Sequence, residues 1–373
     1  MPSATVPFMD LSPQWDRIRD AVMPDMERLF AASAFCLGDW VSDFEARIGD
    51  YLGAAHAVAV SSGSAALHLA VVAGGIGRGD KVLVPSNTFV GTVWGLIYAG
   101  AVPIFCDVES ATGTIDMADT ALRMEEGVRA IIPVHLYGQP ADMDAVASFA
   151  REHDLMVIED AAQAIGARHG GRAVGTIGRM GCFSFYPGKN LGGAGEGGLI
   201  ITDDAEDAAL LRALRDHGQS QRYVHDRVGF NYRMDGIQGL VLGHKLPLLD
   251  EWTDQRRMLA ARYQLAFAGL PLNLPTVVHY DHVFHLYVVR SETSEALRAH
   301  LADNGIATGR HYPIPLHRQP CFADLPTPIR GFPVTEDFAA NGISLPLFAG
   351  MTIDQQDRVI NAVTAFFQKD PYG

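Results

Sequence analysis

The sequence has few cysteines, few basic residues and no long apolar run, and each shortage excludes a class of protein. The net charge is −14, from 29 basic and 43 acidic side chains, which argues against nucleic-acid binding because that needs a basic face. No run of 18 apolar residues exists, so we expect no membrane span, and residues 1–10 lack the basic start of a signal peptide. The 373 residues contain only four cysteines, at positions far apart that match no paired-ligand spacing: Cys36, Cys106, Cys182 and Cys321. We therefore expect reduced thiols, no metal site and a soluble cytoplasmic protein.

What the chain does contain is a hydrophobic fraction of 48%, enough for a large core and two domains. Short apolar segments alternate with helical patterns up to about residue 216, which is typical of a mostly parallel α/β sheet covered by helices. The expected strands include residues 57–60, 81–85, 102–106, 131–135, 155–159, 182–185 and 198–202.

The pattern changes near residue 250. Helices are expected over 252–267, 293–303 and 353–367, with a strand at 283–289. We therefore predict a large domain over residues 1–250 and a smaller C-terminal α+β domain over residues 251–373.

Lys189 lies where a short aromatic strand is broken by Tyr186-Pro187-Gly188, before a glycine-rich loop. One interpretation is a lysine that caps a turn. The other is an amine in a desolvated pocket that forms a Schiff base. The second requires a carboxylate, a phosphate cradle and an aromatic side chain elsewhere in the chain.

Four further segments offer such groups, each with a plainer alternative. SSGS at 61–64 joins a strand to an apolar helix, which suits phosphate, although serine there can simply cap the helix. The strand at 156–160 ends in Asp160, at the sheet edge where α/β folds bind ligands, although Asp160 can also cap the next segment. Phe89 follows another strand and can stack on a planar cofactor or pack in the core. GFNYRMD at 229–235 places an amide and a guanidinium between two helices.

SSGSAAL, EDAAQ, SFYPGKNLG and GFNYRMD, in this order, resemble the nucleotide-sugar aminotransferases of the DegT/StrS group, which belong to the fold-type-I pyridoxal-phosphate enzymes. The resemblance spans nearly the whole chain. It implies a large domain whose mostly parallel seven-stranded sheet is covered by helices, followed by a smaller α+β domain. It also implies a homodimer with shared active sites.

The resemblance assigns roles residue by residue. Lys189 would hold pyridoxal 5'-phosphate and move the proton between cofactor and substrate carbons. Asp160 would pair with the ring nitrogen, Gln163 would hydrogen-bond the ring oxygen, and Phe89 would stack on the ring. The phosphate would be held by Gly63, Ser64, Ala65 and Ser184, with Asn231 reaching it from the other subunit.

The substrates implied are L-glutamate and a keto sugar on a nucleoside diphosphate. HYPIPLHRQP at 311–320 and HVFHLYVVR at 282–290 resemble members that aminate a 3-keto hexose, usually carried on dTDP. The substrate-binding residues would then be Tyr186, Arg233, His311 and Tyr312. Arg310 stands where an aliphatic residue is expected. The diphosphate needs local cations, for which the candidates are Arg222, Arg227 and Arg233.

Three alternatives stay open. The sugar can be a 4-keto or a UDP- or GDP-linked one. A related enzyme class uses the same cofactor to dehydrate sugars, but its members lack the lysine that is present here as Lys189. A non-enzymatic regulator on the same fold is the third, although no basic helix-turn-helix segment supports it.

Overall fold

The computed structural model describes residues 5–278, 281–325 and 330–368. Its main sheet consists of β1 (His56–Val60), β2 (Lys81–Pro85), β3 (Val102–Cys106), β4 (Val128–Ile131), β5 (Met156–Asp160), β8 (Met180–Ser184) and β9 (Gly198–Thr202). The strand order is β1-β9-β8-β5-β4-β2-β3. Neighbours are parallel from β8 to β3, whereas β9 is antiparallel to both β1 and β8. The predicted seven-stranded, mostly parallel sheet is confirmed.

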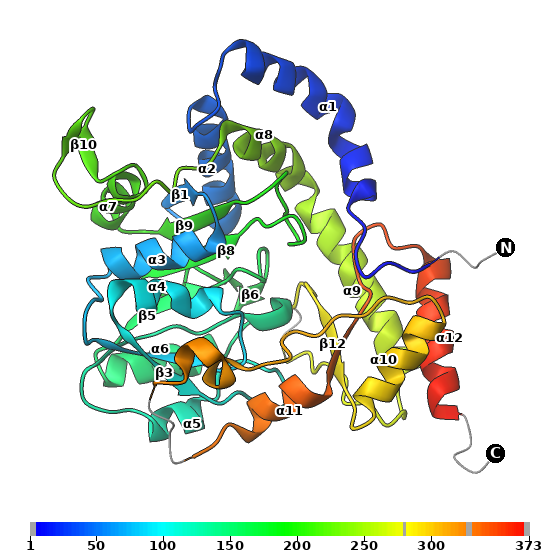
Figure 1. Cartoon of the computed structure of the whole chain (residues 1–373). Coiled ribbons are helices and arrows are strands. Elements are labelled where there is room, and N and C mark those ends of the chain that lie inside the picture. Colours follow the sequence, from blue (N-terminus) through cyan, green and yellow to red (C-terminus); the bar gives the residue numbers. More distant parts are fainter. Residues whose placement is uncertain (1–4, 279–280, 326–329, 369–373) are drawn as a thin grey trace.

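Helices cover both faces of this sheet and extend to one side of it (Figure 1). They are α1 (Ser12–Ala31), α2 (Asp39–Leu52), α3 (Gly63–Ala73), α4 (Gly91–Ala99), α5 (Met117–Leu122), α6 (Met143–Glu152), α7 (Ala205–Arg215), α8 (Gly236–Lys245), α9 (Leu249–Ala266), α10 (Ser294–Asp303), α11 (Pro333–Asn341) and α12 (Ile353–Gln368). The described residues also form the 3-10 turns η1 (Leu136–Gly138), η2 (Leu246–Leu248), η3 (Leu316–Arg318) and η4 (Pro320–Phe322). Short hairpins are formed by β6 (Arg168–His169) with β7 (Arg172–Ala173), and by β10 (Gln219–Gln221) with β11 (Val224–His225).

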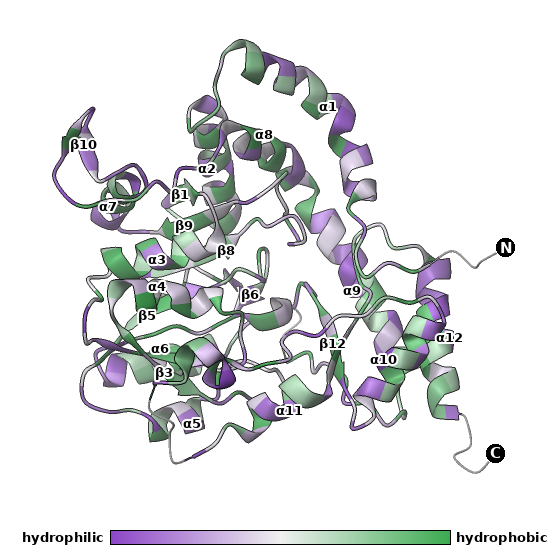
Figure 2. Ribbon diagram, viewed as in Figure 1, coloured by the Kyte–Doolittle hydropathy of each residue, from purple (hydrophilic) through white to green (hydrophobic). Residues whose placement is uncertain are grey.

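The central strands are apolar throughout because both of their faces are covered. Successive side chains of a strand point to opposite faces. Ile200 of β9 therefore packs in the cluster that contains α3, whereas Leu199 and Ile201 pack with Phe44 and Ile48 of α2. Figure 2 shows the matching helix patterns, with α3 mostly hydrophobic and α1 alternating in hydropathy. This explains why the strands have no polar alternation in the sequence.

A second, smaller core surrounds the antiparallel pair β12 (Tyr287–Arg290) and β13 (Gly342–Leu345). Side chains of α9, α10 and α12 pack there, and Val6 joins them from the other end of the chain. Val6 also forms a bridge with Ile306. The division into domains at residue 250 stays a prediction.

Two expected strand positions are wrong. The strand expected at 283–289 begins only at Tyr287, because the preceding backbone bonds elsewhere: Val283 N–H donates to Gly138 O, and Arg256 donates to the carbonyls of Phe284 and His285. The strand expected at 131–135 is β4, which ends at Ile131. Pro133 lies just beyond it and has no N–H for the sheet.

No helix in residues 5–278, 281–325 and 330–368 is both long and apolar enough to cross a membrane.

Candidate active site

A cavity of about 860 Å³ lies at the carboxyl ends of the parallel strands, where open α/β sheets bind ligands. The predicted site residues that line it are Gly63, Ser64, Phe89, Asp160, Gln163, Ser184, Tyr186, Lys189, His311 and Tyr312. These residues come from segments up to 249 positions apart in the chain, counted from Gly63 to Tyr312.

Lys189 follows β8 in a tight turn, closed by its N–H donating to the Tyr186 carbonyl at 2.8 Å. Burial lowers the pKa of its amine from 10.5 to about 8, although the charge of Asp160 opposes the shift. About a tenth of the amine is therefore neutral and nucleophilic at pH 7, far more than at the ordinary lysine pKa. A lysine that merely capped a turn would point to solvent, and this one lines the cavity.

Asp160 is the last residue of β5 and presents its carboxylate to the same cavity. Thr92 Oγ1 donates to Oδ2 at 2.7 Å, and the N–H of Ala162 donates to Oδ1 at 3.1 Å. Burial raises the pKa of Asp160, while Thr92, Ala162 and Lys189 oppose the rise. Turns rather than a helix follow Asp160 at residues 161–167, and Asp160 caps their start through the N–H of Ala162, so capping and a role in the cavity are compatible.

The N-terminus of α3 opens on the cavity. Ser62 caps this helix, with its hydroxyl accepting the N–H of Ala65 at 3.1 Å. Ser184 lies so close that a Cβ built on Gly63 would be 2.7 Å from the Ser184 Cβ. The first N–H groups of a helix have no partner within it and, with the helix dipole, attract anions. Gly63 and Ser64 are free to do so, whereas Ala65 is buried and its N–H is already used by the cap.

Gln163 is held in one orientation by its neighbours. Its Oε1 accepts the backbone N–H of Tyr137 at 2.7 Å, and its Nε2 donates to the hydroxyl of Tyr312 at 3.1 Å. Because only the amide oxygen can accept an N–H, Nε2 must face the cavity.

Aromatic side chains form the mouth of the cavity. Phe89 is 53% exposed and lies tilted against Tyr312 at a ring distance of 5.6 Å, so the alternative that it packs in the core is wrong. Tyr186 is also exposed. His311 binds Ser344 Oγ through Nδ1 at 2.7 Å. Burial, together with the charge of Lys189, lowers the pKa of His311 to about 4, so its ring is neutral at pH 7.

Three predicted residues do not line the cavity of this chain: Ala65, whose N–H is used by the helix cap, Asn231 and Arg233. Asn231 is exposed, on the segment that bridges to Asp216. Arg233 forms an ion pair with Asp216 at 2.6 Å. Their assigned contacts with the ligand therefore need a second chain and stay predictions. Arg310 also points away, since it pairs with Glu295 at 2.7 Å and donates to carbonyls of α11.

Sequence reasoning missed several residues of the site. Thr92 lies in the first turn of α4, and its hydroxyl is 2.8 Å from that of Thr88. Because Thr88 precedes the helix, no helical spacing in the sequence marked the pair. His285 is buried in the wall, and burial and the charge of Lys189 hold its pKa well below 6.5. No pattern in the sequence distinguished this histidine from a packing residue.

Glu159 was also missed, because it points to the face of β5 opposite Asp160. Its two oxygens accept three backbone N–H groups of residues 175–178 and Nε2–H of His135 at 3.0 Å. His135 Nδ1 accepts the N–H of Ala141, which fixes this tautomer. Burial raises the pKa of Glu159, but His135 and the backbone donors outweigh it, so the pKa is lowered overall. A second ionised carboxylate therefore lies directly behind the cavity.

The DegT/DnrJ/EryC1/StrS aminotransferase family matches residues 16–364. A pleiotropic regulatory protein of Geobacillus stearothermophilus is 42% identical over 97% of this chain and 99% of its own. A dTDP-3-amino-3,4,6-trideoxy-alpha-D-glucose transaminase of Streptomyces venezuelae is 41% identical over 98% and 97%. A UDP-N-acetyl-3-dehydro-alpha-D-glucosamine 3-aminotransferase of Acidithiobacillus ferrooxidans is 40% identical over 97% and 98%.

Solved structures with a similar fold over nearly the whole chain include members of the same kind of enzyme. S. venezuelae DesV, in complex with a ketimine intermediate, has a TM-score of 0.96 and 40% identity, covering 99% of this chain and 100% of its own. NtdA of Bacillus subtilis with bound cofactor PMP has a TM-score of 0.92 and 28% identity, covering 99% and 87%.

Proposed function

Because the chain belongs to the DegT/DnrJ/EryC1/StrS aminotransferase family, whose members include pyridoxal-phosphate-dependent sugar aminotransferases, we propose that it transfers the amino group of L-glutamate to a keto carbon of a nucleotide-linked deoxyhexose. The observation that carries this proposal is the pairing of Lys189 with Asp160 in one cavity beside the N-terminus of α3. An amine, an acid and an anion site that line one cavity are the groups that pyridoxal phosphate requires.

The residues fit pyridoxal phosphate. When bound, the cofactor supplies an aldehyde that carries the amino group and a ring that accepts the electron pair of the broken C–H bond. Lys189 would hold the aldehyde, and its amine, freed during the reaction, would move the proton. Asp160 would face the ring nitrogen, oriented by Thr92 and Ala162. An ion pair of this kind would keep that nitrogen protonated.

The phosphate, the ring oxygen and the ring face of the cofactor would also have partners in the cavity. The close approach of Ser184 to Gly63 leaves a cradle for phosphate at the start of α3, with Ser64 beside it. Ala65 contributes by satisfying the cap on Ser62 rather than by direct contact. Gln163 would donate to the ring oxygen, and exposed Phe89 would cover the ring.

The sugar nucleotide would enter past Tyr186, His311 and Tyr312 at the mouth of the cavity. A 3-keto sugar is favoured because relatives that are about 40% identical are named for 3-amino sugars. The names of those two relatives specify a dTDP-linked and a UDP-linked sugar, and we propose dTDP from the likeness of residues 311–320.

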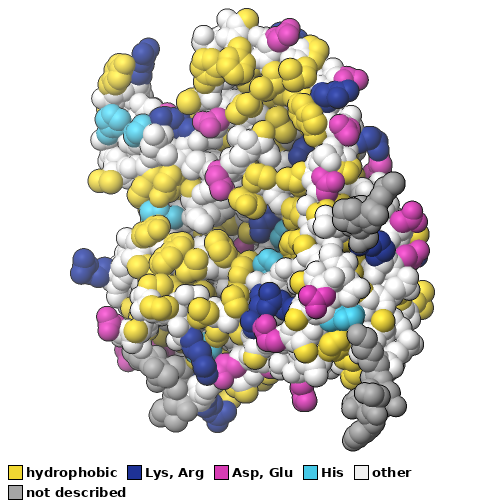
Figure 3. Space-filling view, turned by 45° about the vertical axis from the view of Figure 1, so that its right-hand side comes forward, with side chains coloured by type: hydrophobic (Ala, Val, Ile, Leu, Met, Phe, Trp, Pro, Cys, Tyr) yellow, Lys and Arg dark blue, Asp and Glu magenta, His cyan; other side chains and the backbone are white. Residues whose placement is uncertain are grey.

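A homodimer would complete the site. Apolar side chains gather on the upper part of the molecule in Figure 3, which α1 and α2 occupy; Trp15, Met23, Phe30 and Phe35 are each at least 40% exposed there. Exposed patches of this kind mark interfaces. The β10–β11 hairpin also projects from the body (Figure 1), next to the segment that carries Asn231 and Arg233.

Mixing two inactive variants tests the shared site. If Asn231 serves the partner's cofactor, chains with Lys189→Ala and chains with Asn231→Ala should regain activity when refolded together, up to about one quarter of wild type, because half of the dimers then hold one intact site. A mixture no more active than its components would mean that each site is made by one chain.

The central experiment is an amination assay. Purified protein with pyridoxal phosphate and L-glutamate is offered 3-keto and 4-keto hexoses on dTDP, UDP and GDP, and the amino sugar is detected by mass spectrometry. We expect product with a 3-keto sugar and none from Lys189→Ala. No amino sugar from any of the substrates would overturn the proposal.

A regulator that binds the cofactor without turnover is the second candidate, favoured by the name of the Geobacillus stearothermophilus relative. The visible absorption of bound cofactor distinguishes the two. An aminotransferase loses this absorption when glutamate is added and regains it with a keto sugar. A regulator would keep its absorption unchanged in glutamate.

A further inference from the structure

Tyr137 connects two walls of the cavity without lining it. Its backbone N–H donates to Gln163 Oε1 at 2.7 Å, and its hydroxyl donates to the carbonyl oxygen of His311. Gln163 in turn donates to the hydroxyl of Tyr312, the next residue after His311. Tyr137, Gln163, Tyr312 and His311 therefore form a closed ring. Three of its links are hydrogen bonds, and the fourth is the peptide bond between residues 311 and 312.

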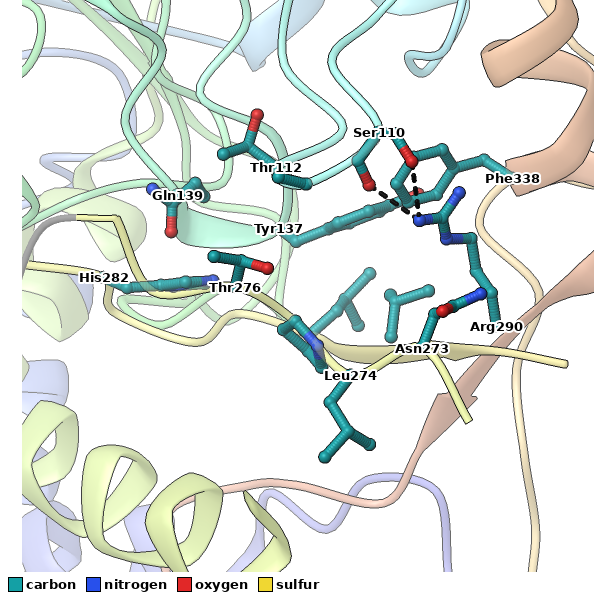
Figure 4. A pocket seen from close by; sticks show the side chains of 14 residues that line it. Ser110, Thr112, Tyr137, Gln139, Asn273, Leu274, Thr276, His282, Arg290 and Phe338 are labelled. Carbon is teal, nitrogen blue, oxygen red and sulfur yellow. Dashed lines mark hydrogen bonds between the residues drawn. The ribbon is translucent and has the colours of Figure 1, made fainter. Parts of the chain in front are cut away.

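Tyr137 is 5% exposed and lines a separate pocket of about 30 Å³ (Figure 4). Leu286 lines both this pocket and the cavity. Figure 4 shows it lying across this pocket toward Phe338, at a ring distance of 6.4 Å. Burial raises the pKa of Tyr137 well above its ordinary value, so the hydroxyl keeps its proton and donates. Tyr137 thus acts on the cavity from outside it.

The backbone of Tyr137 is strained into this position. Its φ of 61° and ψ of 5° lie in the left-handed region, which bulky side chains avoid. Two hydrogen bonds hold the backbone there: the N–H of Tyr137 donates to Gln163 Oε1, and its carbonyl accepts the N–H of Leu286. Strain that the surroundings impose at a site edge is typical of functional positions.

We propose that Tyr137 is a positioning residue that sets both halves of the site: its N–H turns the Gln163 amide toward the cofactor, and its hydroxyl fixes the backbone of residues 311–312 for the sugar nucleotide. The proposal rests on the function given above. The two roles belong to different atoms of Tyr137. The backbone N–H orients Gln163, whereas only the hydroxyl, which a substitution can remove, fixes residues 311–312.

Tyr137→Phe tests this separation because it removes the hydroxyl and keeps the ring and the N–H. We expect KM for the nucleotide sugar to rise about fivefold, the effect of one buried hydrogen bond, with a smaller change in kcat. The visible absorption of the bound cofactor should stay unchanged, because Gln163 is still held. Amide hydrogen exchange over residues 309–318 should become faster.

Tyr263→Phe is the matched control. Tyr263 is fully buried in the smaller core and donates to Pro346 O at 2.8 Å, so Tyr263→Phe removes the same kind of bond at a residue that does not line the cavity. We expect it to leave KM and the exchange of residues 309–318 as in wild type.

The positioning role would be overturned if Tyr137→Phe had the same amide hydrogen exchange over residues 309–318 and the same KM for the nucleotide sugar as wild type. Exchange is measured without substrate, so it decides the point even if no sugar is aminated. If the proposed aminotransferase function is wrong but the positioning role is right, wild type will show no turnover, and amide exchange over residues 309–318 will still be faster in Tyr137→Phe than in wild type.

Discussion

Thr92 donates its hydroxyl to Asp160, with Thr92 Oγ1 2.7 Å from Asp160 Oδ2. Since the proton of Thr92 is used there, its oxygen must accept from Thr88 at 2.8 Å. The first turn of α4 is thereby tied to the end of β5 by a chain of two hydroxyls. This bond lowers the pKa of Asp160 against the effect of burial.

Thr92→Val should raise the pKa of Asp160 further and weaken its charge opposite the ring nitrogen. A hydrogen bond to a charged group is worth about 1.5–3 kcal/mol, so we expect kcat to fall about tenfold or more. Steady-state kinetics measure this. Thr253→Val is the control, because Thr253 is buried and its hydroxyl has no partner among the described residues; equal losses in both variants would deny Thr92 a specific role.

Lys189→Ala should leave a folded protein that still binds pyridoxal phosphate without covalent attachment. Because the proton transfers lose their amine, we expect turnover to fall at least about 10³-fold. Circular dichroism checks the fold, and mass spectrometry after borohydride reduction checks attachment. Covalent cofactor retained in this variant would place the attachment at another lysine.

The rate at which apoenzyme combines with pyridoxal phosphate should depend on pH through Lys189. Only the neutral amine attacks the aldehyde, so the rate should rise with a midpoint near pH 8 rather than 10.5. The charge of Asp160 raises this pKa; Asp160→Asn should therefore move the midpoint below 8. A stopped-flow pH series measures the midpoint in wild type and in Asp160→Asn. The same midpoint in both would show that the charge of Asp160 does not act on the pKa of Lys189.

Asp160→Asn should also reduce turnover heavily while affecting stability less, because the amide cannot carry the charge that keeps the ring nitrogen protonated. We expect kcat to fall by about 10²-fold or more. Rates like those of wild type would mean that Asp160 only organises the turn at Ala162.

Glu159→Gln should cost about 3–5 kcal/mol of unfolding free energy, because a buried paired carboxylate is replaced by an amide that meets backbone N–H groups with its own NH₂. Denaturant unfolding at constant m-value measures this. The pKa of Glu159 is lowered in the fold, so its stabilisation is present above pH 4.5 and lost as the pH falls.

Two comparisons check that interpretation. The wild type should lose stability on acidification more steeply than Glu159→Gln. Glu251→Gln, which breaks the exposed pair with Arg17 at 2.8 Å, should leave the free energy of unfolding close to that of wild type, because solvent screens exposed pairs. A cost for Glu159→Gln as small as that of Glu251→Gln would show that the buried carboxylate is not ionised.

Several features could be predicted from the sequence because they depend on neighbours in the chain. Apolar runs bounded by turns gave the seven strands of the main sheet, and the family motifs indicated the cofactor. The pairing of β12 with β13 could not be found in this way, since the two strands are more than fifty residues apart. The end of β4 was misplaced because the effect of Pro133 depends on which strand lies beside it.

In the candidate site, too, some residues could be predicted from local patterns and others could not. Lys189, Asp160 and Gly63 stand at strand ends or helix starts, where the local pattern already singles them out. Thr92, Tyr137 and His285 carry no such mark. Thr92 matters because it meets a residue 68 positions away, and Tyr137 because it reaches His311 across 174 positions.

The alternation of strands and helices, the family and the reactive groups that the cofactor requires follow from local patterns along the chain. Which side chains orient those groups, which arginines turn away from the cavity and which backbone is strained became visible only in the folded molecule. The reason is physical: propensity and hydrophobic period act over a few residues, whereas hydrogen-bond partners and burial are set by segments that meet only when the chain has folded.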